Sequence, residues 1–243
     1  MNIQNKTILI TGANRGIGRA LVTEALRRGA KRVYAGTRSG ELQNADSRVT
    51  PLTLDVTNTT QIQTAVEKVE SLDVLINNAG LALYDDLSDR AAIEQSLAIN
   101  LYGPYGVTQA FLPLLTGSRG AIISVLSLSS IAAVPFSPAY SISKAAAFSL
   151  SQSLRALLAG RGIKVHVVLP GPVDTDMTRD LDISKASPES VARAIFDGVE
   201  KGEEDIFPDP MAQSIAEGWR TGAAKSLERQ LAAFVPGGAA NPV

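Results

Sequence analysis

The sequence predicts an α/β protein with a doubly wound, parallel, Rossmann-type sheet between two layers of helices. Short apolar or β-branched runs alternate with helical patterns along the chain, as in right-handed βαβ units. A glycine-rich turn separates the first such run from the first helical pattern, and 243 residues suit one α/β domain. We therefore expect a single domain over residues 1–235 and a flexible tail over residues 236–243.

Strands are expected where a short apolar run would be buried on both faces of the sheet. The runs are Thr7–Ile10, Arg32–Gly36, Val49–Leu54, Val74–Asn77, Ala121–Leu126 and Lys164–Leu169, with a short seventh at Asp205–Phe207.

Helices are expected where apolar residues recur at helical spacing. These segments are Ile17–Arg28, Thr60–Glu70, Ala91–Phe111, Ala139–Ala159 and Met211–Phe234. Gly29 and Gly160 follow two of these segments, as C-cap glycines do. A further helix opens at Ser187-Pro188-Glu189, with an N-cap residue before proline.

Composition excludes several kinds of chemistry. The net charge is −1 and no basic block is present, which argues against nucleic acid or an anionic membrane as partner. The absence of cysteine excludes disulfides and thiol catalysis. The single histidine, His166, lies in an apolar run, so we expect it buried in a strand and not in a metal site or a Ser-His-Asp triad. With no signal pattern and no membrane-length apolar run, the chain is expected to be cytoplasmic and free of metal.

The glycine-rich turn predicts a nucleotide site. Gly12 would allow the tight turn, Gly16 would let a pyrophosphate approach the backbone, and Gly18 would let the helix pack close to the strand. The N–H groups at the helix start would then face an anion. The alternative is a tight βα turn without a ligand.

The end of the second expected strand favours NADP over NAD. A carboxylate about 20 residues past the glycine motif binds the ribose of NAD, whereas an arginine there suits the 2′-phosphate of NADP. Arg38 stands at that position and Arg15 lies in the glycine turn, without a carboxylate at the strand tip. Two solvated arginines are the alternative reading.

Four features further along the chain indicate acid–base chemistry. The fourth strand ends in Asn77-Asn78-Ala79-Gly80, Asn100 starts a later helix, and the fifth strand ends in Ser127. Tyr140 and Lys144 lie four residues apart on an expected helix and share one face. An ammonium group beside the phenol would lower the tyrosine pKa from about 10 toward the range useful for proton transfer.

Together these motifs resemble the short-chain dehydrogenase/reductase family, in its single-domain form. The resemblance rests on Thr11-Gly-x-x-x-Gly-x-Gly18, Asp55-Val56, Asn77-Asn-Ala-Gly80, Asn100, Ser127, Tyr140-x-x-x-Lys144 and Pro170-Gly171-x-x-x-Thr175, in the family's order and spacing. It implies that Tyr140 is the acid/base, that Lys144 lowers its pKa and holds the nicotinamide ribose, and that Ser127 binds the substrate oxygen. Asn100 would hold a water of the proton relay.

The resemblance also implies which residues bind the cofactor. They are Gly12, Asn14, Arg15, Gly16, Ile17, Gly18, Thr37, Arg38, Asp55, Val56, Asn77, Ala79, Gly80, Tyr140, Lys144, Pro170, Gly171, Val173 and Thr175. The family places its serine thirteen residues before the tyrosine, which selects Ser127. Ser129 is the alternative, since it points to the same side of an extended chain, and Ser130 would require a shorter loop.

The expected substrate wall is mostly apolar. It comprises Leu81, Leu83, Tyr84, Leu128, Ser129, Phe136, Pro172 and Met177. Such a wall favours an uncharged hydrophobic or aromatic ketone over a keto acid or a sugar phosphate. The segment Asp176–Ala186 is short for the family's substrate loop, which implies either an open pocket or a lid from the C-terminal helix around Trp219.

These observations predict an NADP-dependent oxidoreductase that interconverts a ketone and an alcohol. A nucleotide-binding sensor without turnover is the alternative from another class, since one fold hosts many functions. An epimerase or dehydratase would bring a larger substrate domain. Apolar residues nearly all round Ala91–Phe111 and Ala139–Ala159 predict a homodimer or homotetramer that pairs through these helices.

Overall fold

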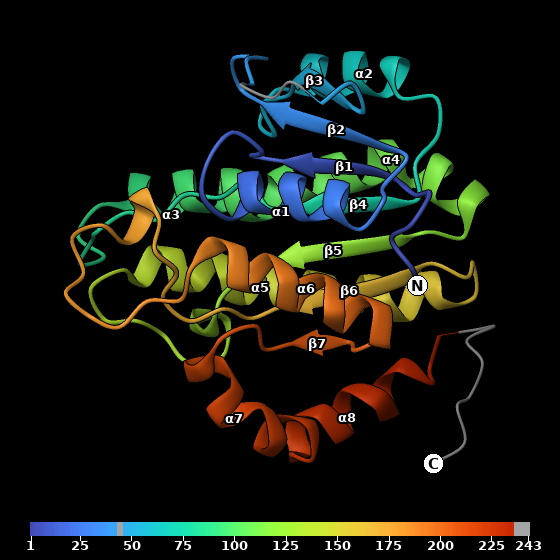
Figure 1. Cartoon of the computed structure of the whole chain (residues 1–243). Coiled ribbons are helices and arrows are strands. Elements are labelled where there is room, and N and C mark those ends of the chain that lie inside the picture. Colours follow the sequence, from blue (N-terminus) through green and yellow to red (C-terminus); the bar gives the residue numbers. More distant parts are fainter. Residues whose placement is uncertain (43–45, 236–243) are drawn as a thin grey trace.

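A computed structural model of the chain, which describes residues 1–42 and 46–235, confirms the doubly wound parallel sheet (Figure 1). Its seven strands lie in the order β3-β2-β1-β4-β5-β6-β7, and every neighbouring pair is parallel. The strands are β1 (Thr7–Thr11), β2 (Arg32–Thr37), β3 (Val49–Thr53), β4 (Val74–Asn77), β5 (Ala121–Val125), β6 (Lys164–Val168) and β7 (Asp205–Ile206). Each expected strand therefore exists, with ends that differ by one residue at most.

Helices cover both faces of the sheet and form two cores. On one face, α1 (Gly16–Arg27) and α6 (Pro188–Lys201) pack on the strands and against each other. On the other face lie α2 (Thr59–Lys68), α4 (Gly103–Ser118) and α5 (Pro138–Ala159). Figure 1 shows α1 and α6 in front of the sheet and α4 and α5 behind it.

The strand order reverses between β1 and β4, which places the site. In an open α/β sheet, ligands bind at the carboxyl ends of the strands beside this switch point. In Figure 1 the strand arrowheads point to the left, toward this edge. The glycine turn, the Asn77–Gly80 motif and Ser127 all follow strands that end there.

Two expected helices are broken. The segment Ala91–Phe111 consists of α3 (Arg90–Leu97), a π-helical turn (Ala98–Tyr102) and α4, so Asn100 lies inside the turn and does not start a helix. The segment Met211–Phe234 consists of α7 (Pro210–Arg220) and α8 (Ala223–Ala232), which separate at Gly222.

Both predicted cap glycines lie where a helix ends. Gly160 is the C-cap residue of α5 but keeps a right-handed φ of −64°, and the left-handed glycine beyond it is Gly162, whose φ is +74°. Gly29 has a φ of +79° just past α1, as a C-cap glycine does. The expected tail, residues 236–243, lies outside the described residues.

Helices α7 and α8 cover β7, the edge strand of the sheet (Figure 1). The Trp219 indole N–H donates to Asp205 Oδ2 over 2.8 Å. Lys225, which is 2% exposed, pairs with Asp205 at 2.8 Å and Glu228 at 3.1 Å. Arg155 of α5 pairs with Asp205 and Glu228 as well. These ion pairs fix the C-terminal helices to α5 and β7.

Among the described residues no helix is long and apolar enough to cross a membrane. The same residues contain no group of three or more potential metal-ligating His, Cys, Asp or Glu side chains.

Candidate active site

The glycine turn has little room for side chains. Gly12 adopts a φ of +66°, and a Cβ there would lie 3.0 Å from the Ala79 Cα. A Cβ on Gly18 would lie 2.0 Å from the Gly12 carbonyl oxygen, so α1 packs as close to the turn as the sequence predicts. Gly16 has a φ of +50°, and its Cβ would lie 3.0 Å from Thr175 Cγ2. No side chain caps α1, because Arg15 at its N-cap makes no such hydrogen bond. The backbone N–H groups at this helix start are therefore available to an anion.

Thr11 and Asn78, for which the sequence predicts no separate role, hold the glycine turn against the end of β4. Asn78 Nδ2 donates to the carbonyl oxygens of Thr11 at 2.9 Å and Gly12 at 3.2 Å. In return, Thr11 Oγ1 accepts from the backbone N–H groups of Asn78 and Ala79, each at 3.0 Å. In the sequence, both residues stand out as polar residues inside a motif. Only the pairing of β1 with β4 shows that Thr11 and Asn78 lie next to each other.

Tyr140 and Lys144 share one face of α5, and Lys144 Nζ lies 5.6 Å from the centre of the Tyr140 ring. The predicted lowering of the Tyr140 pKa is wrong for this structure. Burial raises the pKa of Tyr140, and the hydroxyls of Ser127 and Ser129 offset only part of this effect. Burial also lowers the pKa of Lys144 to about 8. Lys144 Nζ donates to the Val125 carbonyl oxygen over 3.0 Å, which uses one of its three N–H donors.

The serines after β5 differ in their hydrogen bonds. Ser127 Oγ accepts from the Ser129 backbone N–H at 3.1 Å, which leaves its hydroxyl proton free to donate. Ser127 and Ser129 both lie close enough to influence Tyr140. The Oγ atoms of Ser129 and Ser130 are buried and make no regular hydrogen bond.

Asn100 is buried and binds the loop after β4. Its Oδ1 accepts from Leu81 N–H at 2.9 Å, while its Nδ2 donates to Leu81 O and to Ser143 Oγ, each at 2.8 Å. A Cβ on Gly80 would lie 3.3 Å from Asn100 Oδ1 and 3.6 Å from Lys144 Nζ. The glycine thus keeps open a space that both groups border.

The Asn77 side chain faces away from the glycine turn. Its Nδ2 donates to Thr108 Oγ1 of α4 over 3.0 Å, and its buried Oδ1 has no hydrogen-bond partner within residues 1–42 and 46–235. Of this residue, only the backbone is left to line a cofactor. The side chain borders a cavity of about 10 Å³ together with Asn100, Lys144 and Ser151, which is room for about one water.

Two arginines flank the ends of β1 and β2, as the sequence predicts, and both are exposed. Arg15 forms an ion pair with Asp176, in the loop after β6, over 3.1 Å. Arg38 lies near Asp55, and the pKa of that carboxyl group is lowered. Burial alone would raise this pKa, but hydrogen bonds from Thr57 and the positive charge of Arg38 outweigh it. Thr37 and Val56 are buried beside them, whereas Asn14 is exposed and Ile17 packs on the core.

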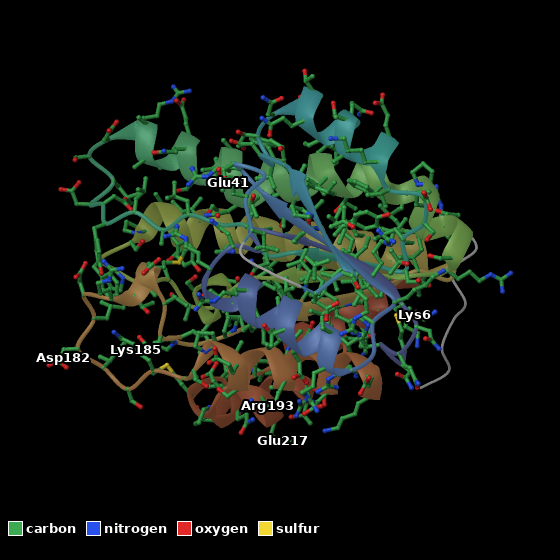
Figure 2. All side chains as sticks on the ribbon, turned by 45° about the horizontal axis from the view of Figure 1, so that its top comes forward. Lys6, Glu41, Asp182, Lys185, Arg193 and Glu217 are labelled. Carbon is green, nitrogen blue, oxygen red and sulfur yellow. The ribbon has the colours of Figure 1, made fainter. Side chains whose placement is uncertain are left out.

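The loop after β6 reaches the same edge. Val173 bridges to Ala186, and a 3₁₀ turn over Asp176–Thr178 lies between them. The expected substrate loop, Asp176–Ala186, is therefore short and closed at its base. In Figure 2 its Asp182 side chain projects at the periphery of the molecule. Pro170 is buried, and the Gly171 N–H donates to Asp209 Oδ2 at 2.8 Å. Sequence reasoning missed Asp209, although Asp-Pro at a helix start is a recognisable N-cap signature.

Several residues of the expected substrate wall are exposed near this edge. Tyr84 and Phe136 lie with their ring centres 5.8 Å apart and are 61% and 49% exposed. Met177 is 44% exposed. Trp219 does not form a lid, because its ring packs edge-on against Phe148. Both belong to a smaller buried cluster, beside the two larger cores, that joins α5 to α7.

The residues present fit a dinucleotide. The glycine turn, which has no room for side chains, leads into the start of α1, where no side chain caps the backbone N–H groups. Arg38 follows β2, and the Asp55 carboxylate follows the neighbouring strand β3. A phenol, an ammonium group and two serine hydroxyls gather beyond them. This arrangement can hold a charged cofactor and move a proton at an adjacent oxygen.

Comparisons with known proteins agree with this geometry. The sequence model for short chain dehydrogenases matches residues 6–186. An uncharacterized oxidoreductase of Staphylococcus aureus is 34% identical over 209 residues, which cover 80% of this chain and 90% of that protein. A relative from Staphylococcus saprophyticus with the same description is 32% identical over 212 residues, covering 80% of this chain and 91% of its own.

Two solved structures are also similar. A short chain dehydrogenase from Burkholderia cenocepacia, in complex with NADP, is 36% identical with a TM-score of 0.87 and covers 95% of this chain and 99% of its own. ElxO with NADP bound is 25% identical with a TM-score of 0.71, covering 80% of this chain and 91% of its own. The chain belongs to the short-chain dehydrogenase/reductase family of oxidoreductases.

Proposed function

We propose that this protein is an NADP-dependent oxidoreductase that interconverts a hydrophobic or aromatic ketone or aldehyde and its alcohol. The observation that carries the proposal is the convergence of Ser127, Tyr140 and Lys144 beside a glycine turn that has no room for side chains. The NADP found in two similar structures supports the choice of cofactor, as does Arg38 at the tip of β2.

The bound cofactor would supply or accept the hydride. Glycines 12, 16 and 18 and the start of α1 would hold its pyrophosphate, and Arg38 its 2′-phosphate. Asp55 and Val56 would meet the adenine, and Pro170, Gly171, Val173 and Thr175 would border the nicotinamide.

Tyr140 would donate a proton to the substrate oxygen as a ketone is reduced, and Ser127 would hold that oxygen. Lys144 has a pKa of about 8, so it is mostly protonated at neutral pH. Its charge would stabilise the tyrosinate left behind. A water in the space beside Gly80, between Asn100 and Lys144, would return the proton.

The proposal is tested with NADPH and a panel of hydrophobic, aromatic and acidic carbonyls. We expect NADPH oxidation with uncharged ketones or aldehydes, and a loss of at least ~100-fold in kcat for Tyr140→Phe, the scale of general acid–base catalysis. NADPH affinity of this variant, measured by fluorescence titration, should change little. Tight NADPH binding without turnover of any carbonyl would instead indicate a non-catalytic NADP-binding protein.

We also propose that the protein acts in the cytoplasm as a homodimer or homotetramer. Helices α4 and α5, which make up most of the segments expected to pair, offer a surface almost without charge, because α4 has no charged residue. The two charged residues of α5, Lys144 and Arg155, are respectively buried and ion-paired. The chain also has no cysteine that would require an oxidising compartment.

A further inference from the structure

The peptide unit between Pro170 and Gly171, in the loop after β6, is hydrogen-bonded on both sides. The Pro170 carbonyl oxygen accepts from the Leu128 backbone N–H at 2.9 Å, directly after Ser127. The N–H of the same peptide, on Gly171, donates to Asp209 Oδ2 at 2.8 Å. A carbonyl and an N–H of one peptide unit lie in one rigid plane. Asp209 is therefore connected to the serine segment through a single rigid group.

Asp209 is itself tightly held. It is 3% exposed, and its Oδ1 accepts from the Ala212 N–H at 3.0 Å as the N-cap of α7. A Cβ on Gly171 would lie 2.9 Å from this Oδ1 and 3.2 Å from the Met211 Cβ. Both carboxylate oxygens are thus used, and the loop has no space to shift toward the helix.

The helix that carries Asp209 is anchored far from the site. Trp219 binds Asp205 of β7 at 2.8 Å from the far end of α7. Lys225 of α8 binds Asp205 at 2.8 Å, and Arg155 of α5 binds the same carboxylate at 2.7 Å. The position of Asp209 is therefore fixed by the packing of α7 and α8 on the sheet edge, and not by the loop it holds.

We propose that Asp209 is a positioning residue of the active site. It holds the Pro170–Gly171 peptide at the hydride-transfer position and, through Leu128, sets the place of Ser127. The C-terminal helices α7 and α8 are then part of the catalytic apparatus. This inference rests on the proposed function, since it concerns the geometry of the same reaction.

The test uses Asp209→Ser and Asp209→Asn in the full chain. Serine and asparagine are good N-cap residues, so α7 should still start normally. Neither offers the second carboxylate oxygen that Gly171 needs. We expect kcat at saturating NADPH to fall at least ~10-fold, because a misplacement of about 1 Å can cost ~100-fold. The NADPH dissociation constant should change less than threefold.

A matched control separates positioning from lost stability. Asn58 caps α2 by accepting from the Gln61 N–H at 3.1 Å. Asn58→Ala should therefore lower the melting temperature while kcat stays near wild type. If Asn58→Ala instead loses as much kcat as the Asp209 variants for the same drop in melting temperature, the proposal is overturned.

Hydrogen–deuterium exchange gives a readout that needs no turnover. Peptides covering residues 126–131 and 168–175 should exchange faster in both Asp209 variants than in wild type and in Asn58→Ala. Unchanged exchange in residues 126–131 would overturn the link to the serine segment. This measurement stands even if wild type reduces no carbonyl, a result that would contradict only the proposed function.

If neither Asp209 variant folds, Gly171→Ala disturbs the same contact from the loop, since its Cβ would press on Asp209 Oδ1. It should raise exchange in residues 126–131 and lower kcat at least ~10-fold, as misplaced reacting groups do. A folded Gly171→Ala protein with wild-type kcat and exchange would overturn the proposal.

Discussion

Three serine hydroxyls follow β5 within four residues, and their surroundings separate them. Ser127 keeps a free proton because its Oγ accepts from the Ser129 N–H. It is also the larger of the two serine influences on the Tyr140 pKa. The Ser130 hydroxyl is buried, and only Ser127 and Ser129 contribute side-chain hydrogen bonds that lower the Tyr140 pKa. Spacing to Tyr140 and local geometry therefore favour the same residue, Ser127.

We expect Ser127→Ala to lower kcat by about 100- to 1,000-fold, the effect of removing one donor to a reacting oxygen. Ser129→Ala should lower it less, because its Oγ makes no regular hydrogen bond. Ser130→Ala is the matched control and should leave kcat near wild type. Steady-state rates of the three variants at saturating NADPH measure this order, and a larger loss in Ser129→Ala would reassign the serine.

Arg38 at the tip of β2 should decide between the two dinucleotides. Arg38→Asp removes a partner of the 2′-phosphate and places a carboxylate beside Asp55. Loss of one charged hydrogen bond costs ~1.5–3 kcal/mol, so NADPH should bind about ten- to a hundred-fold more weakly and NADH should gain in relative preference. The control Arg32→Asp makes the same charge change at the other end of β2. Titration of both cofactors checks this, and an unchanged ratio would leave Arg15 as the main contact.

At the scale of elements, strand β6 carries the only histidine of the chain. His166 is 2% exposed, and its Nδ1 bonds the Glu203 carbonyl oxygen at 2.6 Å. Its Nε2 is buried and has no hydrogen-bond partner among the residues that the structure describes. Burial lowers the His166 pKa, more than the bond to Glu203 raises it. The folded strand therefore prefers the neutral ring, as expected for an imidazole without a second acceptor.

This predicts a loss of stability in mild acid. The unfolded chain, with a histidine pKa of about 6.5, takes up the proton first. The contribution of His166 to the free energy of unfolding should therefore be fully present above that pH and decrease as the pH falls below it. Urea denaturation between pH 7.5 and 5 measures the slope. His166→Gln, which can still donate to Glu203, should remove the slope, and an unaltered slope would assign it to other groups.

Element breaks also have a functional consequence. A π-helical turn between α3 and α4 holds Asn100 where its amide reaches both Leu81 and Ser143. Periodicity alone indicates one long helix here, because apolar residues occur nearly all round the segment and therefore do not mark the turn where the helix changes its pitch. Such π turns occur often at functional sites.

At the scale of the whole molecule, exposed apolar side chains remain on the helices expected to pair. Val107, Phe111, Ala147 and Phe148 are buried within the chain, so they are already covered. Tyr105 of α4 and Ile142 and Leu157 of α5 are 48%, 42% and 59% exposed. A partner subunit would bury them in an isologous contact.

We expect light scattering at micromolar concentration to give at least twice the mass of one 25.5 kDa chain. Leu157→Asp should shift the protein toward monomer, because an unpaired charge in an apolar interface is costly. Ser153→Asp, one turn earlier on α5 and also exposed, tests whether added charge alone is enough. A wild-type mass near that of a single chain would contradict the expectation.

The sequence by itself determined the parallel sheet, the strand boundaries to within one residue and the order of the site motifs. It could do so because strand runs, helix periodicity, the glycine turn and the Tyr140–Lys144 spacing are local patterns. Even the α1 packing contact at Gly18 follows from a short motif.

Only the tertiary structure decided properties that depend on residues far apart in the chain. The direction of the Tyr140 pKa comes from burial of its phenol group in the folded chain. The Asn77 side chain turns to Thr108 because it faces the α4 side of the sheet. Asp209 meets Gly171 because α7 folds back along β7. Such contacts depend on how the elements pack. Packing removes water from a polar group and brings it next to a partner far away in the chain, and a local sequence pattern encodes neither effect.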